Sequence, residues 1–367
     1  MRAKVFSSKR IAMYLIAMGL LLAVNSVNLH AQNFGDSFVY VLSNKNPGNS
    51  ILQFLRGSNG ALTFIREVPT GGSGSGPNGA DPLGSQDSLV LSGDGSFLLA
   101  ANAGSNEVSV LGPRNGQLVR LSKTGSGGTF PNSIALSLDL VYVLNSKGAS
   151  PNVTGFRLDV NGVLHKIVTV ALPAGDAGAN DVQFAPDGSE LLVAVSGTNQ
   201  ILVFPIGSGG VAGSPVAQTS AAASPFAIRF GHNEVALIAN ASGAASSYQL
   251  TGADMLTAIS GDVSDTQKAA CWISVTRDGK FAVVSNTGSG TLSSFAVDAN
   301  GDLSLFEAVA ANPGGAPIDS ALSRDGKFLY LEESAQGKLL IFRLSGGDLS
   351  QIGTITLKEG IQGIAAQ

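Results

Sequence analysis

The chain has 367 residues, a formal net charge of −4, only 13% charged residues and 47 glycines. The acidic balance and the lack of any basic block argue against a nucleic-acid partner or an anionic membrane surface. A lone cysteine, Cys271, excludes an internal disulfide. Few charges together with many glycines predict numerous short strands joined by tight turns.

The first 31 residues have the order of a secretory signal peptide. Four basic residues within the first ten precede an apolar run at residues 11–24, and a short polar segment then ends at Ala31. The run is shorter than the roughly 20 apolar residues that a membrane-spanning helix needs. We therefore expect cleavage near Ala31, export to the periplasm or the medium, and no membrane-spanning segment.

From residue 86 onward the sequence repeats. Turn residues recur at intervals of 45 to 48 residues, at Asp94, Asp139, Asp187, Asn233, Asp278 and Asp325. Each turn separates a short alternating stretch, such as "SLVLS", from a strand rich in apolar and β-branched residues, such as "FLLAAN". Asn-Gly pairs mark a second hairpin turn in several units, because a type I′ turn needs positive φ at both central residues. The pentapeptide "RDGKF" occurs at Arg277–Phe281 and again at Arg324–Phe328, where it predicts a duplicated turn rather than a duplicated active site.

Four antiparallel strands in about 45 residues is the period of a β-propeller blade. Six complete units follow residue 86, Phe38–Gly72 supplies three more strands, and Gly360–Ala366 supplies a single first strand. We therefore predict an all-β fold, a seven-bladed β-propeller that forms one domain over residues 33–367. Pairing of the N- and C-terminal strands would close it and remove the free sheet edges.

The blades resemble a known family. The stretch "VTRDGKFAVVSNTGSGTLSSFAVDANGDLSLFE" at residues 275–307 is similar to blades of the lactonase family of seven-bladed propellers, which includes 6-phosphogluconolactonases and carboxymuconate cycloisomerases. The pattern N-x-G-S at Asn102–Ser105 and Asn286–Ser289 is also similar to the YVTN-type repeats of exported surface propellers. The resemblance covers essentially the whole chain after residue 31 and implies a hydrolase or isomerase that acts on a lactone.

The innermost strand of each blade lines the channel of a propeller, so its inward positions are the natural ligand contacts. Strand alternation, counted back from each turn, places mostly serines and alanines there, with four larger or charged exceptions: Asp181, Arg229, Trp272 and Asp319. Arg229 would anchor a carboxylate or phosphate, and Asp181 or Asp319 would be the catalytic general base. Trp272 would form a stacking wall. The alternatives are an Arg229–Asp181 ion pair that neutralises buried charge, and a Trp272 that fills space between blades.

One position further back, at the predicted mouth of the channel, the residues include a polar ring of Asp87, Asn132, Asn180 and Gln362. This ring would bind a sugar-like or hydroxylated ligand, or it would consist of plain solvated loop residues. The loop Gly71–Gln86 is longer than its counterparts, which predicts a flap over the mouth.

Other motifs carry less information. The lactonase family commonly has a histidine near the mouth, but this chain has none there, and His165 and His232 are expected to be solvated. The histidine-dependent chemistry of the family therefore does not carry over. Cys271 is expected to be a buried thiol. No cluster predicts a metal site, and the G-x-G-x-x-G match at residues 74–79 lacks the helix that a dinucleotide site requires.

Two functions remain open. The first is an exported lactonase-family enzyme that hydrolyses or isomerises a sugar or organic-acid lactone in its channel. The second is a non-catalytic extracytoplasmic propeller that binds a small-molecule ligand, a glycan or a protein partner. The family resemblance favours the first, whereas the missing histidine and the export signal favour the second. In either case we expect a monomer without a cofactor.

Overall fold

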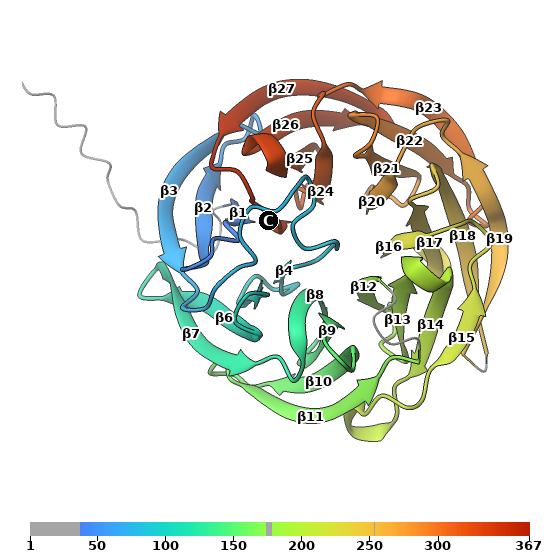
Figure 1. The fold of residues 1–367 in the computed structure, drawn as a ribbon. Coiled ribbons are helices and arrows are strands. Elements are labelled where there is room, and N and C mark those ends of the chain that lie inside the picture. The colour runs from blue at the N-terminus through green and yellow to red at the C-terminus, as the bar shows by residue number, and fades with distance from the viewer. Residues whose placement is uncertain (1–36, 174–177, 253) are drawn as a thin grey trace, which may run out of the picture. The chain divides into compact units, whose positions relative to one another are not determined.

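The computed structural model describes residues 37–173, 178–252 and 254–367, and the predicted signal peptide at residues 1–31 lies outside them. The described residues form seven sheets of four antiparallel strands, arranged as a ring of blades around a central channel (Figure 1). Their helical structure consists of four 3₁₀ segments of three residues each. No helix in the described part of the chain is long and apolar enough to cross a membrane. The predicted seven-bladed propeller is confirmed.

The inner half of each blade consists of two strands. The innermost strands, from the first blade to the seventh, are β28 (Ile364–Ala366), β4 (Leu89–Leu91), β8 (Thr129–Ser137), β12 (Ala179–Phe184), β16 (Pro225–Phe230), β20 (Ala270–Val275) and β24 (Pro317–Leu322). The second strands, in the same order, are β1 (Phe38–Leu42), β5 (Leu98–Asn102), β9 (Leu140–Lys147), β13 (Glu190–Val195), β17 (Val235–Asn240), β21 (Phe281–Asn286) and β25 (Phe328–Glu333). The second strands are almost entirely buried, because neighbouring blades cover both of their faces.

The outer half of each blade faces increasingly toward solvent. The third strands are β2 (Ser50–Arg56), β6 (Glu107–Arg114), β10 (Asn152–Leu158), β14 (Gln200–Pro205), β18 (Ala244–Thr251), β22 (Thr291–Val297) and β26 (Lys338–Ser345). The outermost strands are β3 (Leu62–Pro69), β7 (Gln117–Gly125), β11 (Leu164–Ala171), β15 (Val216–Thr219), β19 (Met255–Ser264), β23 (Leu303–Ala311) and β27 (Asp348–Thr356). The outermost strands are largely exposed or half-buried, whereas the apolar core lies between the sheets of adjacent blades.

The ring closes through the first blade. Its innermost strand, β28, comes from the C-terminus and pairs antiparallel with β1, with Val39 opposite Ala366 and Val41 opposite Ile364. The predicted closure by the two chain ends is therefore confirmed. As a result, the inner edge of β1 is paired and is not open to another chain.

Both RDGKF pentapeptides form the same turn between the innermost and the second strand. The amide of Gly279 donates to the carbonyl of Thr276 at 2.8 Å, and the amide of Gly326 donates to the carbonyl of Ser323 at 2.8 Å. Both glycines have positive φ, 65° and 70°, which explains why glycine stands at this position. The pentapeptide is therefore a repeated hairpin turn, as predicted.

Candidate functional site

A cavity of about 320 Å³ lies in the channel between the innermost strands of five blades. Its walls are formed by the parts of these strands that lie next to the hairpin turns. The lining residues are Asp87, Leu89, Val90, Leu91, Arg229, Phe230, Ser274, Val275, Ser320, Ala321, Leu322, Ile364, Ala365 and Ala366. The volume is at the lower end of the range for small-molecule sites, which is about 300 to 1,000 Å³.

The channel is open at the turn end and closed at the other end. Lining residues near the turns, such as Val90, Arg229 and Ala321, are partly exposed. Residues nearer the starts of the same strands, such as Ser88 and Trp272, are buried. The RDGKF turns therefore lie on the face where the cavity meets solvent, and the predicted mouth, at the starts of the innermost strands, is the closed end of the channel.

The closed end is filled by a segment that we call the strap, residues 81–87, which precedes β4. It runs across the centre of the ring (Figure 1). The carbonyl of Ser85 accepts hydrogen bonds from Trp272 Nε1 at 3.1 Å and from Gln362 Nε2 at 2.9 Å. The hydroxyl of Ser85 donates to the carbonyl of Asn132 at 2.7 Å. The long loop that was predicted to flap over the mouth thus ends in a segment that is packed into it.

Three members of the predicted polar ring hold the strap. Asn132, Asn180 and Gln362 are all buried. Asn180 Nδ2 donates to the carbonyl of Gly84 at 2.7 Å, and Gln362 Oε1 accepts from the amide of Leu83 at 2.7 Å. Asn180 and Gln362 thus bind the strap through their side chains, whereas Asn132 binds it through its carbonyl and its side chain donates to the carbonyl of Ala179 at 3.1 Å. A ligand cannot reach these buried side chains while the strap is in place.

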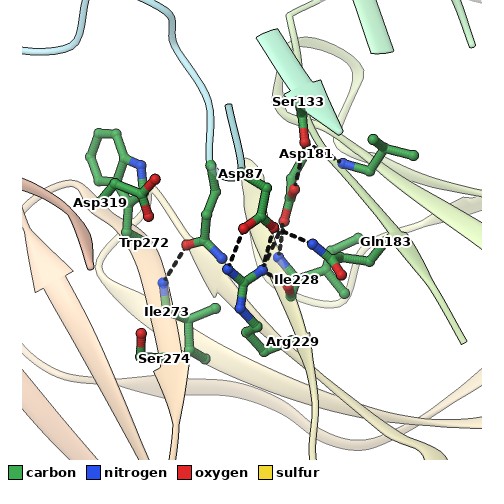
Figure 2. Close-up of polar contacts among 12 residues, drawn as sticks. Asp87, Ser133, Asp181, Gln183, Ile228, Arg229, Trp272, Ile273, Ser274 and Asp319 are labelled. Atoms are coloured by element: carbon green, nitrogen blue, oxygen red, sulfur yellow. Dashed lines mark hydrogen bonds and ion pairs between the residues drawn. The ribbon is translucent and has the colours of Figure 1, made fainter. Parts of the chain in front are cut away.

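The fourth member of the ring, Asp87, lies in the cavity wall and pairs with Arg229 (Figure 2). Arg229 donates from its two terminal nitrogens to the two oxygens of Asp87, at 2.6 and 2.7 Å. A third hydrogen bond runs to the carbonyl of Ile228 at 3.0 Å, and Gln183 Nε2 also donates to Asp87. Burial alone would lower the pKa of Arg229, but the Asp87 carboxylate holds it above its usual value. The pair is a bidentate, charge-assisted contact with side chains that are only partly exposed.

Asp181 lies behind this pair and is fully buried. Its oxygens accept from Ser133 Oγ at 2.9 Å and from the amide of Ile228 at 2.8 Å, while the nearest nitrogen of Arg229 is 4.0 Å away. Burial and the charge of Asp87 raise the pKa of Asp181 well above its usual range, although Arg229 opposes them. The predicted Arg229–Asp181 contact therefore exists at long range, and Asp87 is the main partner of Arg229.

Asp181 belongs to a wider belt of acceptors at the starts of the innermost strands. In four of these strands, a β-bulge is followed by an amide that donates to a side chain. The acceptor belongs to the neighbouring blade in two cases, to the strap in one, and to the preceding residue in one. The amides and their acceptors are Val182 with Ser133, Ile228 with Asp181, Ile273 with Gln86, and Ser320 with Asp319. In the fifth blade Ala227 occupies the acceptor position and cannot accept, so Gln86 of the strap replaces it.

Asp319 and Glu332 extend this belt in the seventh blade. Asp319 accepts from the amide of Ser320 at 2.9 Å, and Glu332 Oε2 accepts from the amide of Gly363 at 2.9 Å. Burial raises the pKa of both carboxyl groups well above the usual values, with the charges of Asp87 on Asp319 and of Asp319 on Glu332 adding to it. Neither side chain lines the cavity.

Trp272 and Cys271 are part of the core. The Trp272 ring lies 4.9 Å from that of Phe226, centroid to centroid, and does not line the cavity. The stacking role that the sequence predicted for Trp272 is therefore not available in this arrangement, and the packing alternative describes its surroundings. Burial raises the pKa of the Cys271 thiol, with a further contribution from Asp81.

Neither of the described histidines is part of the cavity wall. The side chain of His165 is 61% exposed and contacts Asp159 at 3.0 Å, and His232 is exposed in the segment between β16 and β17. Neither lines the cavity. Within the described ranges, no group of three or more histidine, cysteine and carboxylate side chains is arranged to hold a metal ion.

The sequence reasoning missed Gln86, Gln183 and Glu332. Gln183 stands at an inward position of β12 by strand alternation, but the prediction did not name it. Glu332 lies on a second strand, where no channel residue was sought. Gln86 belongs to the strap, and the only signal for it was the length of the loop before β4.

The comparisons with known proteins agree with this architecture. The model of the family described as lactonase, 7-bladed β-propeller, matches residues 182–361. A proposed 6-phosphogluconolactonase from Bacteroides fragilis is 20% identical, with a TM-score of 0.73 over 91% of this chain and 99% of that one. The periplasmic gluconolactonase of Pseudomonas aeruginosa is 18% identical, with a TM-score of 0.74 over 90% of this chain and 98% of that one. No curated protein matches the chain. At these identities the solved structures support the fold alone.

Proposed function

This chain is a lactonase-family seven-bladed β-propeller, and we propose that it hydrolyses a small lactone in the cavity at the turn end of its channel. The observation that carries the proposal is the bidentate Asp87–Arg229 pair in the wall of that cavity. The pair places a hydrogen-bond donor and a carboxylate side by side, which are the two groups that ester hydrolysis requires.

Arg229 is assigned to the carbonyl of the lactone. Its hydrogen bonds to described residues use three of its five N–H groups, so two remain for a substrate oxygen. These groups would stabilise the negative charge that develops on the carbonyl oxygen when water attacks. The hydrogen bond to the carbonyl of Ile228 fixes the orientation of the guanidinium group.

Asp87 is assigned as the general base, in place of Asp181 or Asp319. It lines the cavity, whereas the other two carboxyl groups are buried behind the wall. Asp87 would take a proton from water as the water oxygen bonds to the carbonyl carbon. The ring C–O bond then breaks, and the same proton passes to the leaving alkoxide, so that lactone and water yield one hydroxy acid.

A titration assay with purified protein tests these roles. Arg229→Ala and Asp87→Asn should each lower kcat/KM for lactone hydrolysis by about 100-fold or more, because each removes a group that acts in the transition state. Arg277→Ala and Asp94→Asn are matched controls, since both residues are exposed in turns of the same face but do not line the cavity. Equal activity in all four variants would refute the assignment.

A non-catalytic propeller is the second candidate. It is favoured by the contacts of Asp87, whose two oxygens already accept hydrogen bonds from Arg229 and Gln183. Such a protein would bind a small molecule, a glycan or a protein partner without turnover. Binding of lactones without hydrolysis in the same assay would favour this function over the first.

We also propose that the protein is exported. The order of charged and apolar residues at the start of the chain supports this location, and one protein of the same fold is described as a periplasmic gluconolactonase. Fractionation of cells that produce the full chain and a form lacking residues 2–31 measures it. Retention of both forms in the cytoplasm would contradict export.

A further inference from the structure

We infer that the substrate of this cavity is an uncharged lactone, without a phosphate or carboxylate group, which reaches the cavity from the turn face. The inference rests on the proposed function and names its substrate class. Its basis is the balance of charge in and behind the cavity wall, which offers no cation to an anionic ligand.

The first step is the charge of the wall itself. Among the described residues that line the cavity, Asp87 and Arg229 carry the only charges. The terminal nitrogens of Arg229 are bonded to both oxygens of Asp87, so the pair is neutral as a whole. A phosphate that bound the two remaining N–H groups of Arg229 would lie beside the Asp87 carboxylate, whose negative charge opposes it, and it could use both terminal nitrogens only by displacing Asp87.

The second step concerns the carboxyl groups behind the wall. Asp181 lies 4.0 Å from Arg229, and both Asp181 and Asp319 are buried. Burial raises the pKa of both carboxyl groups well above their usual values, so burial opposes a charge on either of them. The groups behind the wall therefore leave the neutral Asp87–Arg229 pair without an additional cation for an anionic ligand.

The third step concerns the rest of the wall and the rim. The remaining lining residues are apolar apart from Ser274 and Ser320, whose hydroxyl groups lie 2.9 Å apart and bond to each other. Basic turn residues such as Arg277 and Lys280 lie on the same face, but they are exposed and do not line the cavity. These surroundings fit the carbon skeleton of a small ring with one carbonyl group.

The test uses a matched pair of substrates and the native protein. Hydrolysis of glucono-δ-lactone and of 6-phosphoglucono-δ-lactone, which differ only in the phosphate, is followed by titration, together with unsubstituted δ-valerolactone. We expect kcat/KM for the two uncharged lactones to exceed that for the phosphorylated one by about 100-fold or more. Equal or faster hydrolysis of the phosphorylated lactone would overturn the inference while leaving the proposed function intact.

If no lactone is hydrolysed, the proposed function is refuted, and a binding experiment then tests the charge argument by itself. In calorimetric titration with inorganic phosphate, the native protein and Arg229→Ala should behave alike, because the native protein has no phosphate binding that depends on Arg229. Asp87→Asn, with its fold checked by circular dichroism, should gain phosphate binding because the guanidinium fork is released. Arg229-dependent binding by the native protein, or no gain in Asp87→Asn, would overturn the charge argument.

Discussion

At the scale of single residues, the buried carboxyl groups around the channel act first as hydrogen-bond acceptors for the backbone. Asp181 and Asp319 accept amides at bulges of the innermost strands, as the neutral side chains of Ser133 and Gln86 do in other blades. A buried amide without a partner is costly, so any acceptor of the right length serves at these positions. Where a carboxyl group is the acceptor, an acid is buried in the core, and burial opposes its ionisation.

The stability of the protein should consequently depend on pH in an unusual direction. Burial raises the pKa of Asp181, Asp319 and Glu332 above the values in the unfolded chain, so between these values the native state holds more protons. The free energy of unfolding therefore falls as the pH rises from about 4 through the raised pKa values. Surface carboxyl groups have the opposite effect on stability, but only in acid. For example, the hydrogen bond from the Thr276 hydroxyl lowers the pKa of Asp278, so this group adds stability that is lost only at low pH. We expect Tm by calorimetry to be highest near pH 5 and lower by about 5 °C or more at pH 8.5.

Glu332→Gln should reduce that loss. The amide oxygen keeps an acceptor for the amide of Gly363, and the charge that burial opposes is removed. We expect the variant to gain more stability at pH 8.5 than at pH 5, and Glu359→Gln, at an exposed position, to change neither. An equal loss of Tm at both pH values would show that the carboxylate is needed for packing and would contradict the argument.

At the scale of elements, the strap decides which end of the channel is used. It contributes Asp87 to the cavity wall and Gln86 to the acceptor belt, while its other residues fill the closed end of the channel. Side chains from at least three blades bond to it, among them Trp272 and Gln362. A segment held in this way positions Asp87 against Arg229, although it has no regular secondary structure between β3 and β4.

Gln362→Ala should loosen the strap without unfolding the blades. The change removes three hydrogen bonds, to the amide of Leu83, the carbonyl of Ser85 and the carboxylate of Asp81. If each of these hydrogen bonds contributes about 1 kcal/mol, their loss should accelerate amide exchange in residues 81–87 by about 100-fold. Exchange in the second strands should stay unchanged in this variant. Gln351→Ala, at an exposed position on β27, is the control and should leave exchange unchanged throughout the chain. Protection of the strap equal to that of the native protein would show that other contacts hold it.

At the scale of the whole molecule, the ring depends on three residues at the end of the chain. β28 supplies the innermost strand of the first blade, and Ile364 and Ala365 are buried against the neighbouring blades. Without β28, the inner edge of β1 would expose unpaired amide and carbonyl groups.

Removal of residues 361–367 should therefore destabilise all seven blades together. We expect a loss of cooperative unfolding or a fall in Tm of at least about 10 °C, with aggregation through the exposed edge. Removal of Gln367 alone, which deletes one hydrogen bond to the carbonyl of Phe38, should have little effect. Normal Tm and solubility in the longer deletion would mean that the ring does not need its closure.

The local patterns were predictable wherever they depended on neighbours in the sequence. The Asp-Gly turns and the closure by the two chain ends follow from spacing and from strand alternation. The asparagines of the N-x-G-S pattern are likewise repeated structural residues: Asn102 Nδ2 donates to Ser109 Oγ at 2.8 Å, and Asn286 Nδ2 to Ser293 Oγ at 2.7 Å. Alternation also placed Arg229 correctly in the channel wall.

The partners of Arg229 were beyond the reach of the sequence. Asp87 and Arg229 are 142 positions apart in the chain, and their contact requires both the closed ring and the path of the strap across it. Alternation likewise could not show that Asp181, Trp272 and Asp319 turn into the wall, because the bulges change the direction of the side chains at the starts of these three strands.

The sequence by itself determined the number of blades, the position of their turns and the means of closure, because a β-propeller is built from repeated local pairings between neighbouring strands. Only the tertiary structure decided which end of the channel is open and which carboxylate meets Arg229. Those features arise where seven blades and the strap converge on one axis, and the side chains that meet there belong to distant parts of the chain.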